Sequence, residues 1–86
     1  MPFDIRLAGK AGEDLSAMPS SARLQVLRAI RERLSAAPLS FGKPLRHSLS
    51  GMRSLRVGDW RIGYSVEGAT VIVEHIELRR DAYKGW

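Results

Sequence analysis

Apolar and polar side chains alternate at the start of the chain and again in several segments of its C-terminal half. Residues 3–7 alternate between the two kinds, which predicts a short half-buried strand that is broken by glycines within residues 9–12. Three later segments are rich in strand-forming residues and are separated by short turn sequences, which predicts an antiparallel meander. These segments are residues 53–57, 60–66 and 70–76.

Helical spacing lies between the first strand and the meander. Residues 13–18 predict a helical turn or short helix, and residues 21–36 predict a longer one. Pro38 ends the longer helix, because the residue before a proline avoids helical geometry. We expect an apolar stripe of this helix to cover one face of a sheet and its arginines to be solvated. The stripe consists of Val26, Leu27, Ile30 and Leu34.

Residues 37–51 connect this helix to the meander and contain several prolines and glycines. We expect no regular structure there, and connectors of this length are often functional. Together the segments predict a single α+β domain over residues 1–86, with the element order β-α-α-β-β-β. Its last three strands form a small antiparallel sheet, which an N-terminal pair of helices covers on one face.

The composition limits the chemistry that this domain can perform. The chain of 86 residues has no cysteine, which excludes disulfides, a thiolate nucleophile and cysteine-ligated metal sites. Because it also has only two histidines, we expect no metal and no cofactor. The N-terminal residues do not resemble a signal peptide, and no apolar run is long enough to span a membrane, so we expect a cytoplasmic location.

Positive charge is the most informative part of the composition. The formal net charge is +5, and eleven of the fourteen basic residues are arginine. The planar guanidinium group of arginine suits phosphate, so nucleic acid is the first partner to consider. A merely soluble basic protein is the alternative interpretation.

The turn at Gly58 and Asp59 fixes the pairing of the first two meander strands. A two-residue turn with glycine in the first position is typical of a tight hairpin. Counting outward from it, Arg56 lies directly opposite Arg61, on the face away from the helices. Like charges in this position destabilise a sheet, so we expect an anion to relieve the repulsion.

Strand alternation assigns further side chains to one face or the other. Glu74 is predicted on the same face as the two arginines, whereas His75 is predicted on the core face. The arginines therefore either form a salt-bridged network with Glu74 or provide a cradle for a phosphate. Arg79 and Tyr83 follow the last strand and can return beside the same face, where Tyr83 either stacks on a base or packs on the sheet edge.

Three stretches of the sequence form a recognisable pattern. Residues 42–45 read GKPL and residues 55–64 read LRVGDWRIGY, while the tail at residues 78–83 reads LRRDAY. This pattern, which spans nearly the whole chain, resembles the RelE/ParE superfamily of bacterial type II toxin–antitoxin toxins and implies a RelE-like fold. The RelE branch implies a ribosome-dependent mRNA endoribonuclease, and the ParE branch implies inhibition of DNA gyrase without nuclease activity.

The resemblance favours the RelE branch and implies a set of catalytic residues. The matching positions are Arg56, Arg61, Arg79 and Tyr83, and Glu74 is a weaker candidate from strand alternation alone. Basic residues that are further candidates for RNA binding are Lys43, Arg46, Arg53, Arg80 and Lys84. Leu78 stands where the family often has a histidine. Some RelE toxins have a lysine-rich segment before the hairpin, and here Arg53 and Arg56 stand in its place. These two departures leave the identity of the general acid and base open.

The implied reaction is metal-independent attack of a ribose 2′-OH on the neighbouring phosphate. Arginine remains protonated at neutral pH, so the three arginines would stabilise charge, whereas Tyr83 is the best candidate for proton transfer. The implied partners are the ribosome, mRNA and a cognate antitoxin, with no membrane and no small-molecule cofactor. A catalytically silent protein that only binds nucleic acid or antitoxin is a third interpretation.

Overall fold

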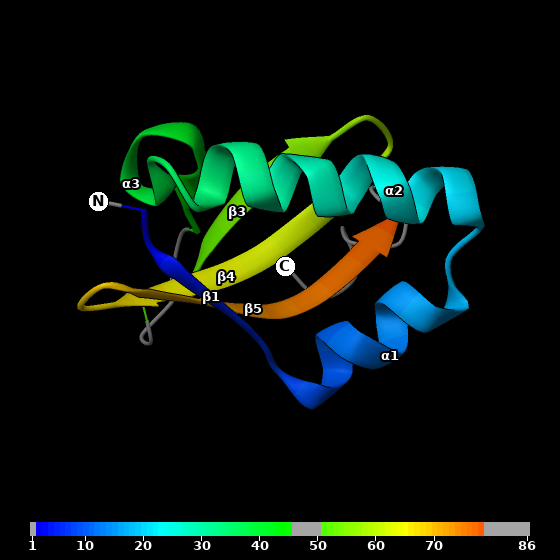
Figure 1. Ribbon diagram of the computed structural model, residues 1–86, viewed down its shortest axis with the longest axis horizontal. Helices are drawn as coiled ribbons and strands as arrows, with labels where there is room; N and C mark the ends of the chain where they lie inside the picture. Colours follow the sequence, from blue (N-terminus) through cyan, green and yellow to red (C-terminus); the bar gives the residue numbers. More distant parts are fainter. Residues whose placement is uncertain (1, 46–50, 79–86) are drawn as a thin grey trace.

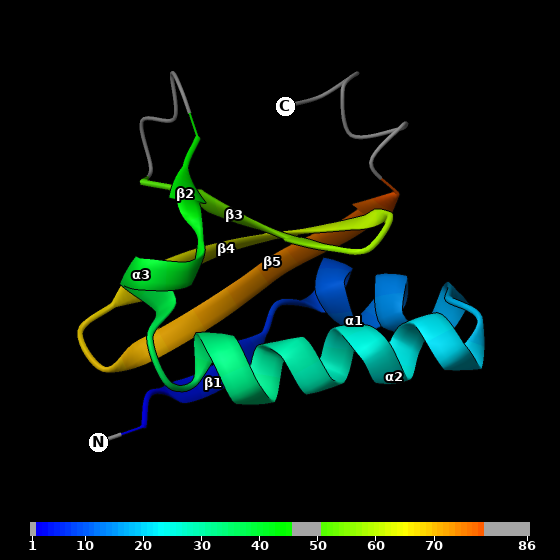
Figure 2. The ribbon, with the colours of Figure 1, turned by 90° about the horizontal axis from the view of Figure 1, so that it is seen from above.

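Helices occupy the first half of the chain, and a three-stranded meander occupies most of the second half. The computed structural model describes residues 2–45 and 51–78. The described elements are β1 (Asp4–Leu7), α1 (Gly9–Ala17), α2 (Ser20–Ala29), η1 (Ile30–Leu34), α3 (Pro38–Phe41), β2 (Lys43–Pro44), β3 (Arg53–Val57), β4 (Trp60–Glu67) and β5 (Thr70–Leu78). The α+β class is confirmed, and Figures 1 and 2 show α1 and α2 on one side of the sheet.

The described strands form a single sheet in the order β1-β5-β4-β3-β2. The predicted meander of β3, β4 and β5 is confirmed, but β1 pairs with β5 in parallel, so the sheet is mixed. The predicted connector contains α3 and β2, so the expectation of no regular structure there was wrong. Pro38 lies in the first turn of α3, where a proline favours a helix start, and Pro44 lies on an edge strand, where a proline is tolerated.

Helix α1 begins at Gly9, whereas the sequence predicted a helix only from residue 13. The two glycines disfavour a helix by about 1 kcal/mol each relative to alanine. Tertiary packing outweighs this cost, because Ala11 and Leu15 are buried against the sheet. The glycines therefore lowered the predicted helix propensity without preventing the helix.

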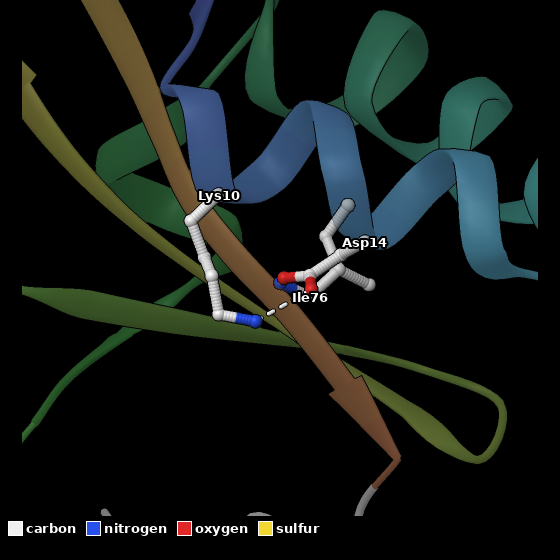
Figure 3. A network of polar contacts seen from close by, with 3 residues as sticks. All are labelled: Lys10, Asp14 and Ile76. Atoms are coloured by element: carbon white, nitrogen blue, oxygen red, sulfur yellow. Dashed lines mark hydrogen bonds and ion pairs between the residues drawn. The ribbon is translucent and has the colours of Figure 1, made fainter.

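Asp14 joins α1 to the edge of β5 beyond the end of β1 (Figure 3). One carboxylate oxygen accepts a hydrogen bond from the Ile76 N–H at 2.9 Å, and the other accepts one from Lys10 Nζ at 2.7 Å. The strand thus keeps a hydrogen-bond partner where none of the described strands covers it. Asp14 raises the pKa of Lys10 above the usual value, first through the hydrogen bond between the two side chains and then through its negative charge.

The predicted long helix is present as α2 and η1, which follow each other directly. The turns of η1 are wider than those of an α-helix, and the Ser35 N–H donates to the Ile30 carbonyl at 3.0 Å. The predicted apolar stripe is buried with one exception. Leu27 is 37% exposed, and Ala29, which was not part of the predicted stripe, is buried.

The core lies between these helices and one face of the sheet. The strand residues buried there are Leu55, Val57, Ile62, Tyr64, Val71, Val73 and Ile76. The Tyr64 hydroxyl donates to the Pro38 carbonyl at 2.6 Å, which fixes α3 to the sheet. A Cβ atom at residue 42 would overlap the Tyr64 hydroxyl, so Gly42 is required for this close approach.

Candidate functional site

The β3–β4 hairpin places two arginines opposite each other, as the sequence predicted. Gly58 has a φ of 58° in the two-residue turn, and the register pairs Arg56 with Arg61. Both lie on the sheet face opposite to the helices, which we call the far face. Arg56 is exposed and Arg61 is half-buried. Because this pairing of like charges is unfavourable, the geometry favours an anionic ligand.

Three glutamates of the described strands share the far face with the arginines, and Glu67 is the one at the end of β4 furthest from the hairpin turn. Glu77 of β5 is the register partner of Arg61, so this row across the sheet carries two positive residues and one negative. Glu74 lies on the far face, as predicted, and accepts a hydrogen bond from Ser65 Oγ at 3.0 Å. The negative charge of these glutamates therefore lies along β5 and at the end of β4, whereas the two arginines lie together near the hairpin turn.

A β-bulge moves His75 to the far face, so its predicted place on the core face was wrong. Gly63 pairs with His75, but the next residue, Tyr64, pairs with Val73, which leaves Glu74 as an extra residue in β5. The extra residue reverses the alternation of side chains that follows it. A glycine within a strand pattern is a known signal for a bulge, and Gly63 supplied that signal.

A pocket of about 450 Å³ opens at the edge of the sheet beside the arginine pair. Its lining residues are Arg33 of η1, Phe41 of α3, Lys43 of β2, Ser54, Leu55 and Arg56 of β3, and Arg61 of β4. We call it the cationic pocket, because four of these residues are basic and none is acidic. Its volume lies in the range of sites that hold small molecules.

Three of the four basic side chains in the cationic pocket have no counter-charge among the described residues. The side chains of Arg33, Lys43 and Arg56 form no hydrogen bond or ion pair within residues 2–45 and 51–78. These three side chains are exposed and line one pocket, so their positive charges add to the same local field. A bound anion would offset this field, and phosphate suits both guanidinium and ammonium groups.

Two other arginines are occupied by backbone carbonyls. Arg23 donates to three carbonyls at the end of α1, including that of Leu15 at 2.7 Å. Arg53 donates to the carbonyls of Leu39 and Gly42 at 2.9 and 2.7 Å, and it lies on the core face of β3. These bonds add partners to carbonyls at and near helix ends, where hydrogen bonding within the helix is incomplete. The RNA-binding role of Arg53 stays a prediction.

The structure brings together only part of the predicted site. Lys43, Arg56 and Arg61 meet in the cationic pocket, and Glu74 lies elsewhere on the far face. The predicted site residues Arg46, Arg79, Arg80, Tyr83 and Lys84 lie outside the described residues. Within the described part of the chain, no three His, Asp or Glu residues gather as metal ligands, and no helix is long and apolar enough to cross a membrane.

Sequence reasoning missed Arg33 and Phe41 of the cationic pocket. Arg33 belongs to the helix whose arginines were predicted to be solvated, and Phe41 to the predicted connector. No local pattern marks either residue, since each reaches the pocket through the way η1 and α3 pack beside the sheet. The pairing of β2 with β3, which brings Lys43 to the same pocket, is equally non-local.

Known toxin proteins match this chain in sequence. A family model described as the ParE toxin of the type II toxin-antitoxin system, parDE, matches residues 5–83. The chain is 35% identical to Toxin RelG of Mycobacterium tuberculosis (strain ATCC 25618 / H37Rv), over 98% of this chain and 99% of RelG. It is 31% identical to Toxin RelE of the same organism, over 96% of this chain and 88% of that toxin.

The fold matches a solved structure of the same kind. The crystal structure of the RelBE2 toxin-antitoxin complex from Mycobacterium tuberculosis superposes with a TM-score of 0.85 and 32% identity. The match covers 92% of this chain and 93% of that one. Sequence, length and fold thus agree with the motif pattern. The chain belongs to the RelE/ParE superfamily, the toxins of bacterial type II toxin–antitoxin systems.

Proposed function

We propose that this toxin is a ribosome-dependent mRNA endoribonuclease. The observation that carries the proposal is the opposed pair of Arg56 and Arg61 beside the cationic pocket. Two guanidinium groups on neighbouring strands of one face suit a phosphate, and Arg56 has no hydrogen-bond or ion-pair partner among the described residues. The names of the relatives RelG and RelE favour the RelE branch of the superfamily.

The proposed reaction is an in-line displacement at phosphorus. The 2′ oxygen of one nucleotide attacks the phosphate that links it to the next, and the bond to the 5′ oxygen breaks. One proton leaves the 2′-OH and one is added to the 5′ oxygen, so the products are a 2′,3′-cyclic phosphate and a 5′-OH. The reaction therefore needs a base, an acid and charge stabilisation.

Charge stabilisation is the proposed role of Arg56 and Arg61. They project from neighbouring strands on one face, so both can donate to non-bridging oxygens of the same phosphate. The guanidinium groups remain charged throughout the reaction. Loss of one such donor typically lowers the rate by roughly 10²–10³-fold. Arg79 is proposed for the same role from the sequence pattern.

Proton transfer has three candidates in this proposal. Tyr83 follows from the family pattern, and Glu74 from its place on the far face. His75 is added because the bulge puts it on that face, opposite Gly63, which has no side chain to separate it from β3. Histidine exchanges a proton near neutral pH more readily than other side chains. Separate Tyr83→Phe, Glu74→Gln and His75→Ala variants would identify the group from the pH–rate profile.

The partners follow from the proposed reaction. The ribosome would position the mRNA, and orientation alone can lower a barrier by several kcal/mol, so we expect little cleavage of free RNA. RelBE2 was solved as a toxin-antitoxin complex, and we propose a cognate antitoxin here as well. A partly disordered acidic segment would suit a basic toxin surface. These partners imply a cytoplasmic location.

A cell-free translation reaction tests the proposal. Purified toxin is added, and new mRNA 5′ ends are mapped by primer extension. New ends should form only while ribosomes translate, and they should disappear with Arg61→Ala but not with Arg31→Ala, which changes an exposed arginine outside the pocket. An intact message with normal translation would contradict the proposal.

Gyrase inhibition is the second candidate function, and the match to the ParE family model favours it. It would act through protein contact and require no phosphate site. In that case the toxin blocks gyrase supercoiling in vitro, and Arg56→Ala and Arg61→Ala retain the inhibition.

A further inference from the structure

We propose that the cationic pocket is a subsite for the mRNA nucleotide next to the scissile phosphate. In this subsite Phe41 stacks on the base, while Arg33 and Lys43 hold the phosphate of that nucleotide. The inference rests on the proposed function. It adds Arg33 and Phe41, which neither the sequence pattern nor the arginine pair includes.

The position of the pocket gives the RNA a path away from the arginine pair. β2 pairs only with Arg53 and Ser54, so the remainder of β3 forms an uncovered edge among the described strands. Arg56 and Arg61 lie on the far face, while Arg33 belongs to the helix on the other side of that edge. Figure 2 shows the chain passing from this helix through α3 to β2. A strand of RNA leaving the pair over the β3 edge enters the pocket.

Charge in the pocket fits a second phosphate. Arg33 and Lys43 line it without a hydrogen-bond or ion-pair partner from the described residues, and they come from η1 and β2. Arg56, which the proposed function assigns to the scissile phosphate, lines the same pocket. Successive phosphates of one strand can thus contact separate cations, which is how single-stranded nucleic acid is usually held.

Phe41 gives the pocket a surface for a base. Its side chain is 50% exposed although it is large and apolar, and it borders a pocket that is otherwise mostly polar. Exposed aromatic rings beside cations are typical stacking platforms for unpaired bases. Leu39 of the same short helix is 61% exposed but does not line the pocket. It provides a matched control.

A peptide strand fits this edge less well than a nucleotide does. Strand addition needs a row of outward backbone groups, and the uncovered part of β3 is only residues 55–57. Because hydrogen-bonded pairs alternate in an antiparallel hairpin, only Arg56 directs its N–H and C=O outward there. A single residue offers too short an edge for a stable added strand, whereas a concave pocket with cations and one ring suits a nucleotide.

Fluorescence anisotropy with an uncleavable RNA tests the subsite. The probe is a fluorescein-labelled, fully 2′-O-methylated hexanucleotide, which lacks the attacking 2′-OH, and the full-length toxin is titrated at low and moderate salt. Arg33→Gln should weaken binding by roughly 10-fold and should reduce the slope of log affinity against log salt by about 0.7. Phe41→Leu should weaken binding by roughly 5- to 10-fold, and Phe41→Tyr should restore it.

The controls separate the subsite from general positive charge. Arg31→Gln and Leu39→Ala should bind the probe as tightly as the wild type does. With an abasic probe, Phe41→Leu and the wild type should have the same affinity. Equal losses of affinity for Arg31→Gln and Arg33→Gln, or no binding of the probe by the wild type, would overturn the proposed subsite. Mapping of mRNA ends gives an independent readout. Intact mRNA with pocket-dependent binding contradicts only the proposed cleavage, whereas cleavage without pocket-dependent binding contradicts only the subsite.

Discussion

Two pairs of arginines differ in what their guanidinium groups contact. Arg23 and Arg53 donate to backbone carbonyls at the end of α1 and around α3. Arg33 and Arg56 line the cationic pocket and form no hydrogen bond or ion pair with described residues. The first pair satisfies carbonyls that need partners, so it stabilises the fold. The second pair adds repulsion to the fold, so its presence points to a ligand.

The contrast is sharpest within β3. Arg53 and Arg56 are three residues apart, and strand alternation puts them on opposite faces of the sheet. The Arg53 side chain donates to backbone carbonyls, whereas the Arg56 side chain forms no hydrogen bond or ion pair with the described residues. A high arginine content therefore says little until each guanidinium group has been placed. The predictions that follow test this division between stability and function, from the largest expected effect to the smallest.

Arg61→Ala should have the largest effect, and the effect should be on activity. We expect ribosome-dependent cleavage to fall by about 100- to 1,000-fold, because a donor to the transition-state phosphate is lost. The midpoint of thermal unfolding should change little, because removal of the repulsion with Arg56 offsets the loss of the interaction that Arg61 makes within the fold. Primer-extension rates and circular dichroism measure the two quantities. A large fall in the midpoint would contradict this division of roles.

Arg53→Ala should reduce stability. Its side chain donates two hydrogen bonds that hold Leu39 and Gly42 in place. Hydrogen bonds from charged groups contribute about 1.5–3 kcal/mol each, and water replaces part of this because the side chain is only half-buried. We expect the free energy of unfolding in urea to fall by about 2 kcal/mol. Unchanged stability would show that α3 does not depend on this arginine.

Arg23→Ala should have a smaller effect of the same kind. The residue is half-buried and caps the carbonyls at the end of α1. We expect a loss of about 1–2 kcal/mol in urea unfolding. Arg23→Lys should recover only part of it, because an ammonium group cannot reproduce the planar fork that contacts several carbonyls. Full recovery by lysine would contradict the capping geometry.

Gly12→Ala should stabilise the protein. A Cβ atom at this position in α1 meets nothing within 4 Å, and alanine is favoured over glycine within a helix by about 1 kcal/mol. Combined with Arg23→Ala, it should restore part of the lost stability without changing cleavage per folded molecule. A change in cleavage would show that α1 takes part in function.

The smallest expected effect is on the pH dependence of stability. Asp14 raises the pKa of Lys10, so the charged ammonium favours the folded state. This contribution is present below the usual lysine pKa and is lost as the pH rises through the raised value. We expect the thermal midpoint of the wild type to fall slightly more than that of Lys10→Met in this alkaline range. Parallel curves for the two proteins would contradict the coupling.

Local patterns were enough to predict much of the fold. The turn at Gly58 fixed the register, so the opposition of Arg56 and Arg61 could be counted from the sequence and is confirmed. The long helix and the meander follow from residue periodicity in the same way. The predicted face of His75 was wrong because one extra residue in β5 reverses strand alternation. Gly63 signals a bulge, but only the pairing of β4 with β5 shows which residue is the extra one.

The cationic pocket was harder to predict, because it depends on packing between distant segments. Lys43, Arg56 and Arg61 were predicted site residues, but their meeting with Arg33 and Phe41 requires the placement of η1, α3 and β2 beside the sheet. The pairing of β2 with β3 joins segments on either side of a proline- and glycine-containing connector. Such contacts have no periodic signal in the sequence.

The most direct test compares Arg56→Ala with Arg53→Ala in the same two assays. Urea unfolding measures stability, and primer extension in a translating extract measures cleavage per folded molecule. We predict that Arg56→Ala keeps its stability and loses cleavage by about 100-fold or more, whereas Arg53→Ala loses stability and largely keeps cleavage. Equal cleavage by Arg56→Ala and the wild type, or cleavage by neither, would contradict the proposed function.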